Sequence, residues 1–374
     1  MPDGLLGVAW PSIRAGFSIP LDALGMLLTA SVAGYLTSST LSGPLMSRFG
    51  VGSVLAASCA LTGIGLIGYT LVPVWWMMVL LGVLAGLGAG AIDAGLNTYV
   101  AAHFGEGLMQ WLHASYGIGV TLGPIIMTVA LTTFESWRVG YQAAGVFQIL
   151  LAGAFMLSLP MWNQKDQPAD DAPKRLTDYK TPMSETLRQP KVWGSVLLFL
   201  LYTGAEAGVG MWAYSLLTES RGIDPKMAGF FAGSYWATFT LGRIVAGLYA
   251  KRAGVNLLVM GGLAGAWVGS VLLWWNPAAW VNLLAVALIG FAVAPIFPAL
   301  TSGTSARVGA HFAANTIGMQ MAAAGLGVAA GPGLIGVIAR QTSLEMVPVC
   351  LFVLFTVLLA LYGVASGKKA SEPN

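Results

Sequence analysis

Two carboxylates, Asp93 and Glu206, lie deep inside long apolar stretches of the sequence. A charged side chain at the centre of a bilayer is costly unless it faces a partner or a water-filled cavity, so an acid at that depth is a candidate functional group. Such a group can bind and release a proton, or accept hydrogen bonds from a polar solute. The alternative for each is a structural acid, either protonated or hydrogen-bonded to a neighbouring helix.

Asp93 and Asn97 are four residues apart, so both project from one face of a helix, one turn above the other. We interpret Asp93 as a proton-coupling residue and Asn97 as a substrate-binding residue. The alternative for this pair is a hydrogen bond that packs the helix against a neighbour.

Glu206 is flanked by aromatic side chains, with Tyr202 one turn before it and Trp212 further along the same segment. Aromatic rings stack on the apolar side of a sugar, and a carboxylate accepts hydrogen bonds from its hydroxyl groups. Glu206, Tyr202 and Trp212 are therefore predicted to bind the substrate, although aromatic residues at helical spacing also pack between helices or face lipid. Gly204 and Gly208 predict local bending or unwinding of this segment.

Three further polar side chains lie near the ends of apolar segments. Gln110 is a candidate substrate-binding residue, and His113, on the same helix face, is a candidate proton relay toward Asp93 because histidine titrates near neutral pH. The alternative for His113 is a hydrogen-bonded residue at the membrane interface. Arg243 is predicted to have a gating or structural role, capping carbonyl groups of an adjacent helix or reaching the interface.

The segment APIFPAL carries Pro295 and Pro298, three residues apart. Proline lacks a backbone donor and kinks helices, so this segment is predicted to expose free carbonyl groups. Asn315 and Gln320 are interpreted mainly as hydrogen-bonding residues between helices.

These residues need membrane-crossing helices to position them. Of the 374 residues, 56% are hydrophobic and 9% are charged, whereas soluble domains have about a quarter charged residues. Apolar runs of ~20 residues can cross ~30 Å of hydrocarbon as helices, and these runs are continuous rather than alternating, which predicts an all-α membrane protein. Twelve apolar segments are predicted, at 4–17, 21–48, 51–72, 74–104, 108–133, 138–161, 192–219, 227–250, 255–275, 279–306, 312–340 and 343–366.

The segments form two sets of six, separated by a polar stretch rich in charge and proline. We predict an N-terminal helix bundle over 1–161, a connecting loop over 162–191, a C-terminal helix bundle over 192–366 and a tail over 367–374. Twelve lysines and arginines fall in loops on the side of the connecting loop and five on the other side. The positive-inside rule therefore places the connecting loop and the tail in the cytoplasm.

The first segment is short, because 14 residues give ~21 Å of helix against the ~30 Å of a span. We expect that the sequence begins inside a helix whose upstream part is missing, so that the first helix is truncated. A locally thin bilayer is the alternative. A secretory signal peptide is not predicted.

Two sequence patterns recur at nearly equal offsets. The motif G-x4-R-x-G occurs twice, 204 residues apart, as Gly43, Arg48 and Gly50 and as Gly247, Arg252 and Gly254. The sequence GIGVTLGP over 117–124 recurs as GLGVAAGP over 325–332, at an offset of 208. These matches indicate duplication of a six-helix unit, an architecture that places the substrate site at the midplane between the two halves.

With these motifs, the whole chain resembles the major facilitator superfamily. The two G-x4-R-x-G turns sit where that superfamily has short cytoplasmic loops after its second and eighth helices, although Ser47 stands where an acid is usual. The segments GAGAIDAGLNTYV, with Asp93 and Asn97, and LMQWLHASYGIGVTLGP resemble the fourth and fifth helices of the fucose permease and glucose/galactose symporter group. The resemblance implies the major facilitator fold, with pseudo-twofold symmetry between the bundles, and gating or structural roles for Arg48 and Arg252.

The sequence therefore predicts a multi-pass integral membrane protein, in the inner membrane if the source is bacterial. We expect a monomeric secondary active transporter that moves a sugar or similar small polar solute by alternating access, with protons, the solute and membrane lipids as its partners. The alternatives are efflux of amphipathic drug-like compounds and a transport-inactive membrane receptor or scaffold. An enzyme is not predicted, because H-E-x-x-H and G-x-S-x-G motifs are absent from the sequence. Cofactors, metal sites and nucleic-acid binding are not predicted either.

Overall fold

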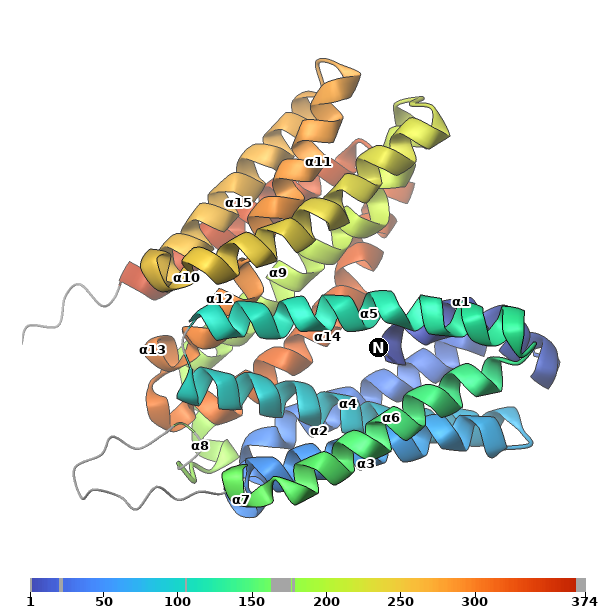
Figure 1. The fold of residues 1–374 in the computed structure, drawn as a ribbon. Coiled ribbons are helices and arrows are strands. Elements are labelled where there is room, and N and C mark those ends of the chain that lie inside the picture. Colours follow the sequence, from blue (N-terminus) through green and yellow to red (C-terminus); the bar gives the residue numbers. More distant parts are fainter. Residues whose placement is uncertain (1, 20–22, 105, 163–175, 177–178, 368–374) are drawn as a thin grey trace, which may run out of the picture. The chain divides into compact units, whose positions relative to one another are not determined.

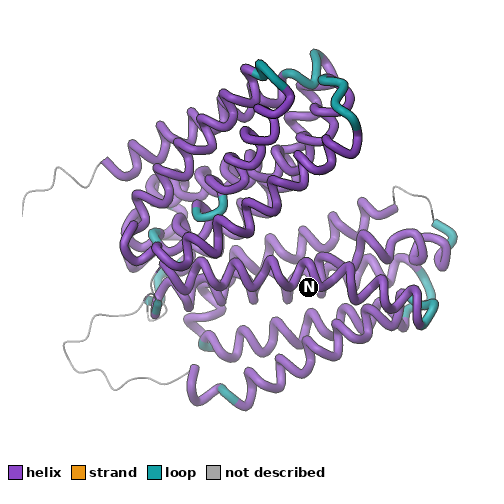
Figure 2. Tube along the Cα trace, turned by 45° about the horizontal axis from the view of Figure 1, so that its top comes forward, coloured by secondary structure: helices purple, strands orange, loops and turns teal. Residues whose placement is uncertain are grey.

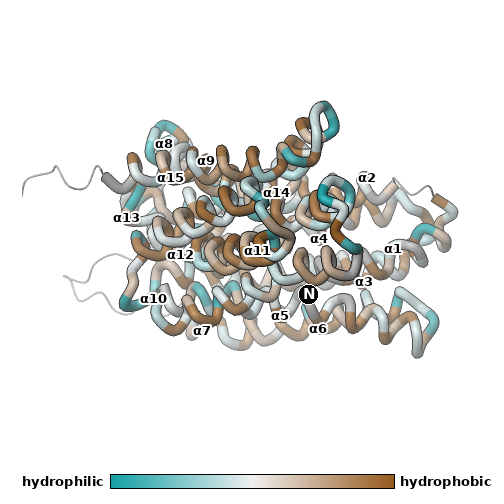
Figure 3. The backbone as a smooth tube through the Cα atoms, turned by 90° about the horizontal axis from the view of Figure 1, so that it is seen from above, coloured by the Kyte–Doolittle hydropathy of each residue, from teal (hydrophilic) through white to brown (hydrophobic). Residues whose placement is uncertain are grey.

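A computed structural model describes residues 2–19, 23–104, 106–162, 176 and 179–367. This part of the chain is helical almost throughout, with short loops between the helices (Figure 2). Within it, 8 helical stretches are long and apolar enough to cross a membrane. Apolar residues run along the whole length of these helices (Figure 3), as expected for segments that contact lipid or one another rather than water.

The first set of helices follows the predicted segments to within a few residues. It comprises α1 (Pro2–Phe17), α2 (Leu24–Phe49), α3 (Val51–Leu71), α4 (Trp75–His103), α5 (Glu106–Thr133) and α6 (Trp137–Leu157), followed by the short α7 (Leu159–Trp162) (Figure 1). The helix α1 has 16 residues, which give ~24 Å of helix.

The second set includes two departures from the prediction. Its elements are α8 (Met183–Leu187), α9 (Pro190–Ser215), the π-helical turn η3 (Leu216–Ser220), α10 (Pro225–Trp275), α11 (Ala279–Val293), α12 (Ile296–Ser302), α13 (Thr304–Val308), α14 (Ala310–Gln341) and α15 (Met346–Gly367). The segment predicted over 279–306 is three helices, because the regular helix is interrupted between Val293 and Ile296, where Pro295 lacks an N–H, and again at Gly303. Part of the predicted connecting loop forms α8, which Asn315 holds through a 2.9 Å hydrogen bond to the Thr186 hydroxyl.

Contacts within the chain define two compact units. The first unit comprises Met1–Ala102, Ser115–Met183 and Ile317–Ala322, and the second comprises His103–Ala114, Ser184–Thr316 and Ala323–Asn374. The start of α5 thus belongs to the second unit, and a short stretch of α14 belongs to the first. The bundle boundaries predicted from the sequence stay a prediction.

Both copies of the G-x4-R-x-G motif end in the same backbone turn. Gly50 has φ 81° and ψ 155°, and Gly254, the break inside α10, has φ 70° and ψ 164°. Side chains other than glycine rarely adopt this region, which explains the glycine at both places. Arg48 and Arg252 are exposed beside these turns, and the Arg48 guanidinium lies 5.3 Å from the centre of the Phe49 ring.

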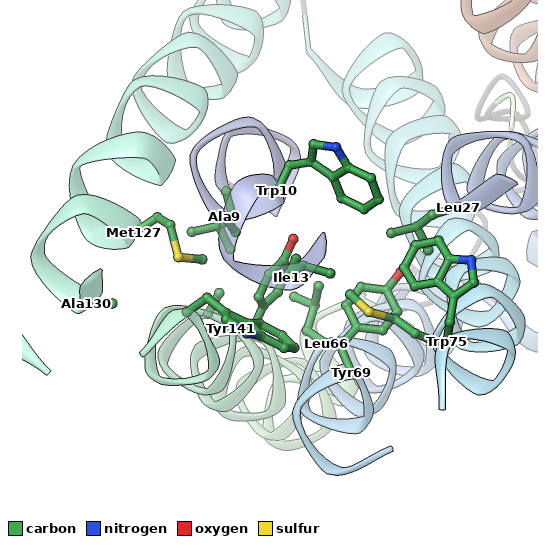
Figure 4. Packing of buried hydrophobic residues seen from close by; sticks show 14 of the residues in the cluster. Ala9, Trp10, Ile13, Leu27, Leu66, Tyr69, Trp75, Met127, Ala130 and Tyr141 are labelled. Carbon is green, nitrogen blue, oxygen red and sulfur yellow. The ribbon is translucent and has the colours of Figure 1, made fainter. Parts of the chain in front are cut away.

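A cluster of aromatic and aliphatic side chains fills the interior of the first unit near one end of its helices (Figure 4). Trp10 and Trp75 have ring centres 5.7 Å apart, and Tyr69 meets Tyr141 edge to face at 5.6 Å. Because lipid is as apolar as these side chains, close packing rather than removal from water holds such helices together.

Glycines bring neighbouring helices into backbone contact at equivalent places in the two units. A Cβ atom added to Gly90 of α4 would lie 2.3 Å from the Tyr35 carbonyl oxygen of α2. A Cβ atom on Gly290 of α11 would lie 2.3 Å from the Tyr235 carbonyl oxygen of α10. Gly290 follows Gly90 by 200 residues, and Tyr235 follows Tyr35 by the same number. The same close crossing therefore occurs in both copies of the repeat.

An arginine ties together several helix ends in the second unit. Arg221, after η3, forms two hydrogen bonds to the Glu345 carboxylate, at 3.0 and 2.7 Å. It also donates to the side chain of Asn282 in α11 and, at 2.8 Å, to the Leu273 carbonyl oxygen of α10. The hydrogen bonds from Arg221 hold the pKa of Glu345 below its usual value.

Candidate functional site

The first intramembrane acid, Asp93 of α4, is held by two side chains in the first unit. The Tyr35 hydroxyl of α2 donates to Asp93 Oδ2 at 2.5 Å. Asn97 Nδ2 donates to Asp93 Oδ1 at 2.8 Å and to the Asp93 carbonyl oxygen at 2.9 Å. Asp93 and Asn97 therefore share a face, as their spacing predicted, and the Asn97 amide fixes the orientation of the carboxylate.

The second acid, Glu206 of α9, contacts two tyrosines in the second unit. The Tyr202 hydroxyl, one helical turn away, forms a short hydrogen bond with Glu206 Oε2 and lies 2.8 Å from the Val293 carbonyl oxygen of α11. The Tyr235 hydroxyl of α10 donates to the Glu206 carbonyl oxygen at 2.9 Å. Tyr202 and Tyr235 are fully buried, and Glu206 is half-buried.

The helix break beside Tyr202 is the one predicted from the prolines. The helix α11 ends at Val293 and α12 begins at Ile296, with Pro295 between them. Gln110 of α5 is fully buried and donates from Nε2 to the Pro295 carbonyl oxygen at 3.0 Å. Side chains from α9 and α5 thus bind the carbonyl groups of this break.

Arg243 of α10 lies in the same cluster. Its Nη1 donates to the His113 carbonyl oxygen of α5 at 3.1 Å, and its guanidinium lies 4.2 Å from the centre of the Phe239 ring. Of the two arrangements expected from the sequence, this bond is the one in which Arg243 caps a carbonyl group of an adjacent helix. The His113 ring packs edge to face on Phe297 of α12 at 4.9 Å. The structure therefore brings Glu206, Tyr202, Gln110, His113 and Arg243 into one unit around the break.

The two glycines of α9 do not unwind the helix, so the prediction of unwinding is wrong, whereas the alternative of local bending stays a prediction. The helix is continuous from Pro190 to Ser215, because Gly204 serves close packing instead. A Cβ atom on Gly204 would lie 3.3 Å from the Gly331 Cα of α14, and one on Gly208 would lie 2.7 Å from Ile335 Cδ1. Trp212, half-buried on the same helix, donates from Nε1 to the Pro332 carbonyl oxygen of α14 at 2.9 Å.

Three residues of these clusters were missed by sequence reasoning: Tyr35, Tyr235 and Phe297. The two tyrosines carried a signal, because Tyr35 and Gly90 recur as Tyr235 and Gly290 at one offset. Phe297 carried none, since a phenylalanine in an apolar run is not distinguished from its neighbours.

The described residues thus form helices that cross a membrane, with hydrogen-bonded ionisable groups inside α4, α9 and α10 and a discontinuous helix at α11 and α12. Intramembrane acids and broken helices of this kind are typical of membrane transport proteins. The chain belongs to the Major Facilitator Superfamily, whose sequence profile matches residues 1–332. It is a multi-pass integral membrane transporter, and the resemblance to this superfamily is confirmed.

Comparison with individual proteins agrees with this family. The human sodium-dependent glucose transporter 1 is 23% identical over 93% of this chain and 72% of that protein. The cis,cis-muconate transport protein of Acinetobacter baylyi is 25% identical over 89% of this chain and 84% of that protein. The crystal structure of FucP, the fucose:proton symporter of E. coli, in the outward conformation superposes with a TM-score of 0.77 over 97% of this chain and 95% of that one, at 12% identity. At this low sequence identity, the superposition shows a shared fold and no more.

Proposed function

We propose that this transporter carries a sugar or similar small polar solute by alternating access and couples its movement to protons. One observation carries the proposal. In each unit an acid inside an apolar helix is hydrogen-bonded to a tyrosine hydroxyl, Tyr35 to Asp93 and Tyr202 to Glu206. Buried acids with polar partners are costly to place in a membrane and mark the paths of substrates and protons.

Asp93 is the proposed proton-coupling residue. When ionised, it accepts hydrogen bonds from Tyr35 and Asn97 at both carboxylate oxygens. A proton on Oδ2 turns the acceptor of the Tyr35 hydrogen bond into a donor and so weakens the bond from α2 to α4. Proton binding therefore changes the contact between α2 and α4, which is the kind of differential interaction that can shift a conformational equilibrium. His113 is proposed as a proton relay.

Glu206, Tyr202, Trp212, Gln110 and Asn97 are the proposed substrate-binding residues. Glu206 is half-buried, so part of its surface is open to a solute. Gln110 Oε1 is fully buried without a hydrogen-bond partner among the described residues, so a solute hydroxyl that reached it in another conformation would supply the missing donor. The indole N–H of Trp212 is bonded to α14, so Trp212 contributes its ring face.

The named relatives support this substrate class. One is a glucose transporter and another is a fucose:proton symporter. They differ in the coupling ion that their names give, sodium in one and protons in the other. The intramembrane acids of this chain favour protons, because a carboxyl group inside the membrane can itself carry the proton.

A small carboxylate is a second candidate substrate. Arg243 has no carboxylate oxygen within 4.0 Å among the residues that the structure describes, and its Nε is buried without a partner. An arginine inside a membrane is stabilised by an anion, and its planar fork fits a carboxylate. The muconate transport protein among the relatives carries a dicarboxylate by name.

Transport in proteoliposomes tests both candidates. Purified protein would be reconstituted and given radiolabelled glucose, fucose, xylose or muconate, with a pH gradient, a sodium gradient or no gradient. We expect accumulation of a sugar with the pH gradient alone, abolished by a protonophore. Accumulation of muconate but of no sugar would establish the second candidate. Binding without flux of any compound would overturn the proposal in favour of a receptor or scaffold, and export of an amphipathic dye alone would favour efflux.

A further inference from the structure

The Tyr202 hydroxyl lies between two oxygen atoms. One is Glu206 Oε2, one turn along α9, and the other is the Val293 carbonyl oxygen of α11 at 2.8 Å. A phenol has one hydroxyl hydrogen, and a carbonyl oxygen only accepts. Two hydrogen bonds at this hydroxyl therefore need a second hydrogen, which an ionised Glu206 does not have. A protonated Glu206 supplies it, by donating to the Tyr202 oxygen while Tyr202 donates to Val293.

We propose that Glu206 is a second proton-binding site of this transporter, and that its proton sets whether Tyr202 holds the break between α11 and α12. This inference rests on the proposed function and adds a proton site in the second unit to the one at Asp93. When the proton leaves Glu206 for water, the carboxylate takes the hydrogen bond of Tyr202, because a bond to a charged acceptor is stronger. The Val293 carbonyl oxygen then loses its donor.

The other groups around Glu206 do not supply the second hydrogen that the two hydrogen bonds at the Tyr202 hydroxyl need. Tyr235 of α10 uses its single hydrogen on the Glu206 carbonyl oxygen. Arg243 of α10 acts on Glu206 through its charge but donates to the His113 carbonyl oxygen of α5 instead. The His113 ring packs on Phe297. Among the described residues, Arg243 therefore donates no hydrogen bond to the Glu206 carboxylate, and the hydrogen count at the Tyr202 hydroxyl stays the same.

The Val293 carbonyl oxygen depends on the hydrogen bond that Tyr202 donates to it. Val293 is the last residue of α11, and the last four carbonyl groups of a helix lack partners within it. Two side chains hold the break, Tyr202 at Val293 and Gln110 at Pro295. After loss of the Tyr202 bond, the bond from Gln110 of α5 to the Pro295 carbonyl oxygen is the remaining one of these two at the break.

Infrared spectroscopy tests the protonation state without any solute. Purified protein at pH 7 is expected to show the carbonyl stretch of a protonated carboxylic acid, and Glu206→Gln should remove the part of this band that belongs to Glu206. The matched control is Glu345→Gln, which should leave the band unchanged because Glu345 pairs with Arg221. A Glu206→Gln band at pH 7 identical to that of the unchanged protein would overturn the proposal.

Hydrogen exchange of residues 289–303 tests the link to the break. After correction for the intrinsic pH dependence, exchange in the unchanged protein should rise about tenfold as the carboxylic acid band disappears with rising pH, since loss of one net hydrogen bond is worth about that factor. Glu206→Gln, whose amide still donates to Tyr202, should stay protected at every pH. Tyr202→Phe should exchange fast at every pH.

Two results would contradict the link: a Glu206→Gln variant with the pH response of the unchanged protein, or protection that stays constant while the band titrates. If Tyr202→Phe does not fold, the comparison of Glu206→Gln with the unchanged protein still decides. Because neither measurement needs transport, failure of the sugar and muconate panel would overturn the proposed function and leave the proton site standing. A negative result in the infrared and hydrogen-exchange measurements would leave the transport proposal intact.

Discussion

The Tyr35 hydroxyl donates to Asp93 at 2.5 Å across the contact of α2 with α4. One turn before Asp93, Gly90 lets the backbone of α4 approach the Tyr35 carbonyl oxygen. The same tyrosine thus contacts α4 through its backbone and its side chain. A change of protonation at Asp93 therefore acts directly on a close crossing of these two helices.

Replacement of Asp93 by asparagine is expected to uncouple transport from protons. The amide keeps the size and much of the hydrogen bonding of the carboxyl group but cannot release a proton. Accumulation driven by a pH gradient should fall at least about tenfold, as expected when a proton-carrying group is lost, whereas exchange of labelled solute at equal pH should remain. Tyr35→Phe is the matched control, because it removes the hydrogen bond and keeps the proton site. Full accumulation by Asp93→Asn would show that Asp93 carries no coupled proton.

The glycine crossing gives a prediction about stability. Gly90→Ala would place a methyl group 2.3 Å from the Tyr35 carbonyl oxygen, and overpacking of this kind costs about 1–3 kcal/mol. The melting temperature of the detergent-solubilised protein should fall. The control is Gly153→Ala in α6, where nothing lies within 4 Å of the new Cβ atom, and it should be neutral or slightly stabilising. Equal effects of the two substitutions would argue against a tight crossing.

Much of the fold could be predicted from the sequence, because long apolar runs leave few alternatives to membrane-spanning helices. The turns at Gly50 and Gly254 and the break at Pro295 were also predictable, since glycine with positive φ and proline without a donor each impose a local geometry. Gly204 shows the limit of such reasoning. A glycine that permits bending and a glycine that permits close packing look alike until the neighbouring helix is known.

The acids of the candidate site could be predicted, but their partners could not. Asp93 and Asn97 paired as their spacing indicated, because both lie on one helix. Tyr35 lies 58 residues before Asp93, and Val293 lies 91 residues after Tyr202. Such contacts depend on which helices are neighbours and at what height they cross. Hydrophobic periodicity does not specify either.

The ion pair of Arg221 and Glu345 predicts a pH dependence of stability. The pKa of Glu345 is lower in the folded protein than in the unfolded chain, so its stabilising effect is complete above the unfolded value of about 4.3 and is lost as the pH falls through the folded value. The melting temperature of Glu345→Gln should therefore lie below that of the unchanged protein at pH 7, and the two should converge in acid. Because the Glu345 side chain is 43% exposed, the difference at pH 7 should be modest. The control Glu219→Gln, at an exposed site, should show no difference at either pH.

Arg243→Lys separates a gating role from a substrate-binding role. Lysine keeps the charge but loses the planar group that lies on the Phe239 ring and donates to the His113 carbonyl oxygen. If Arg243 stabilises one conformation, the rate of solute exchange should fall about tenfold, the effect of losing a bond to a charged donor, while the KM for a neutral sugar stays the same. If Arg243 binds a carboxylate, the KM for muconate should rise instead. Kinetics of exchange at equal pH on both sides would measure these constants. Unchanged kinetics with both solutes would show that the guanidinium serves neither role.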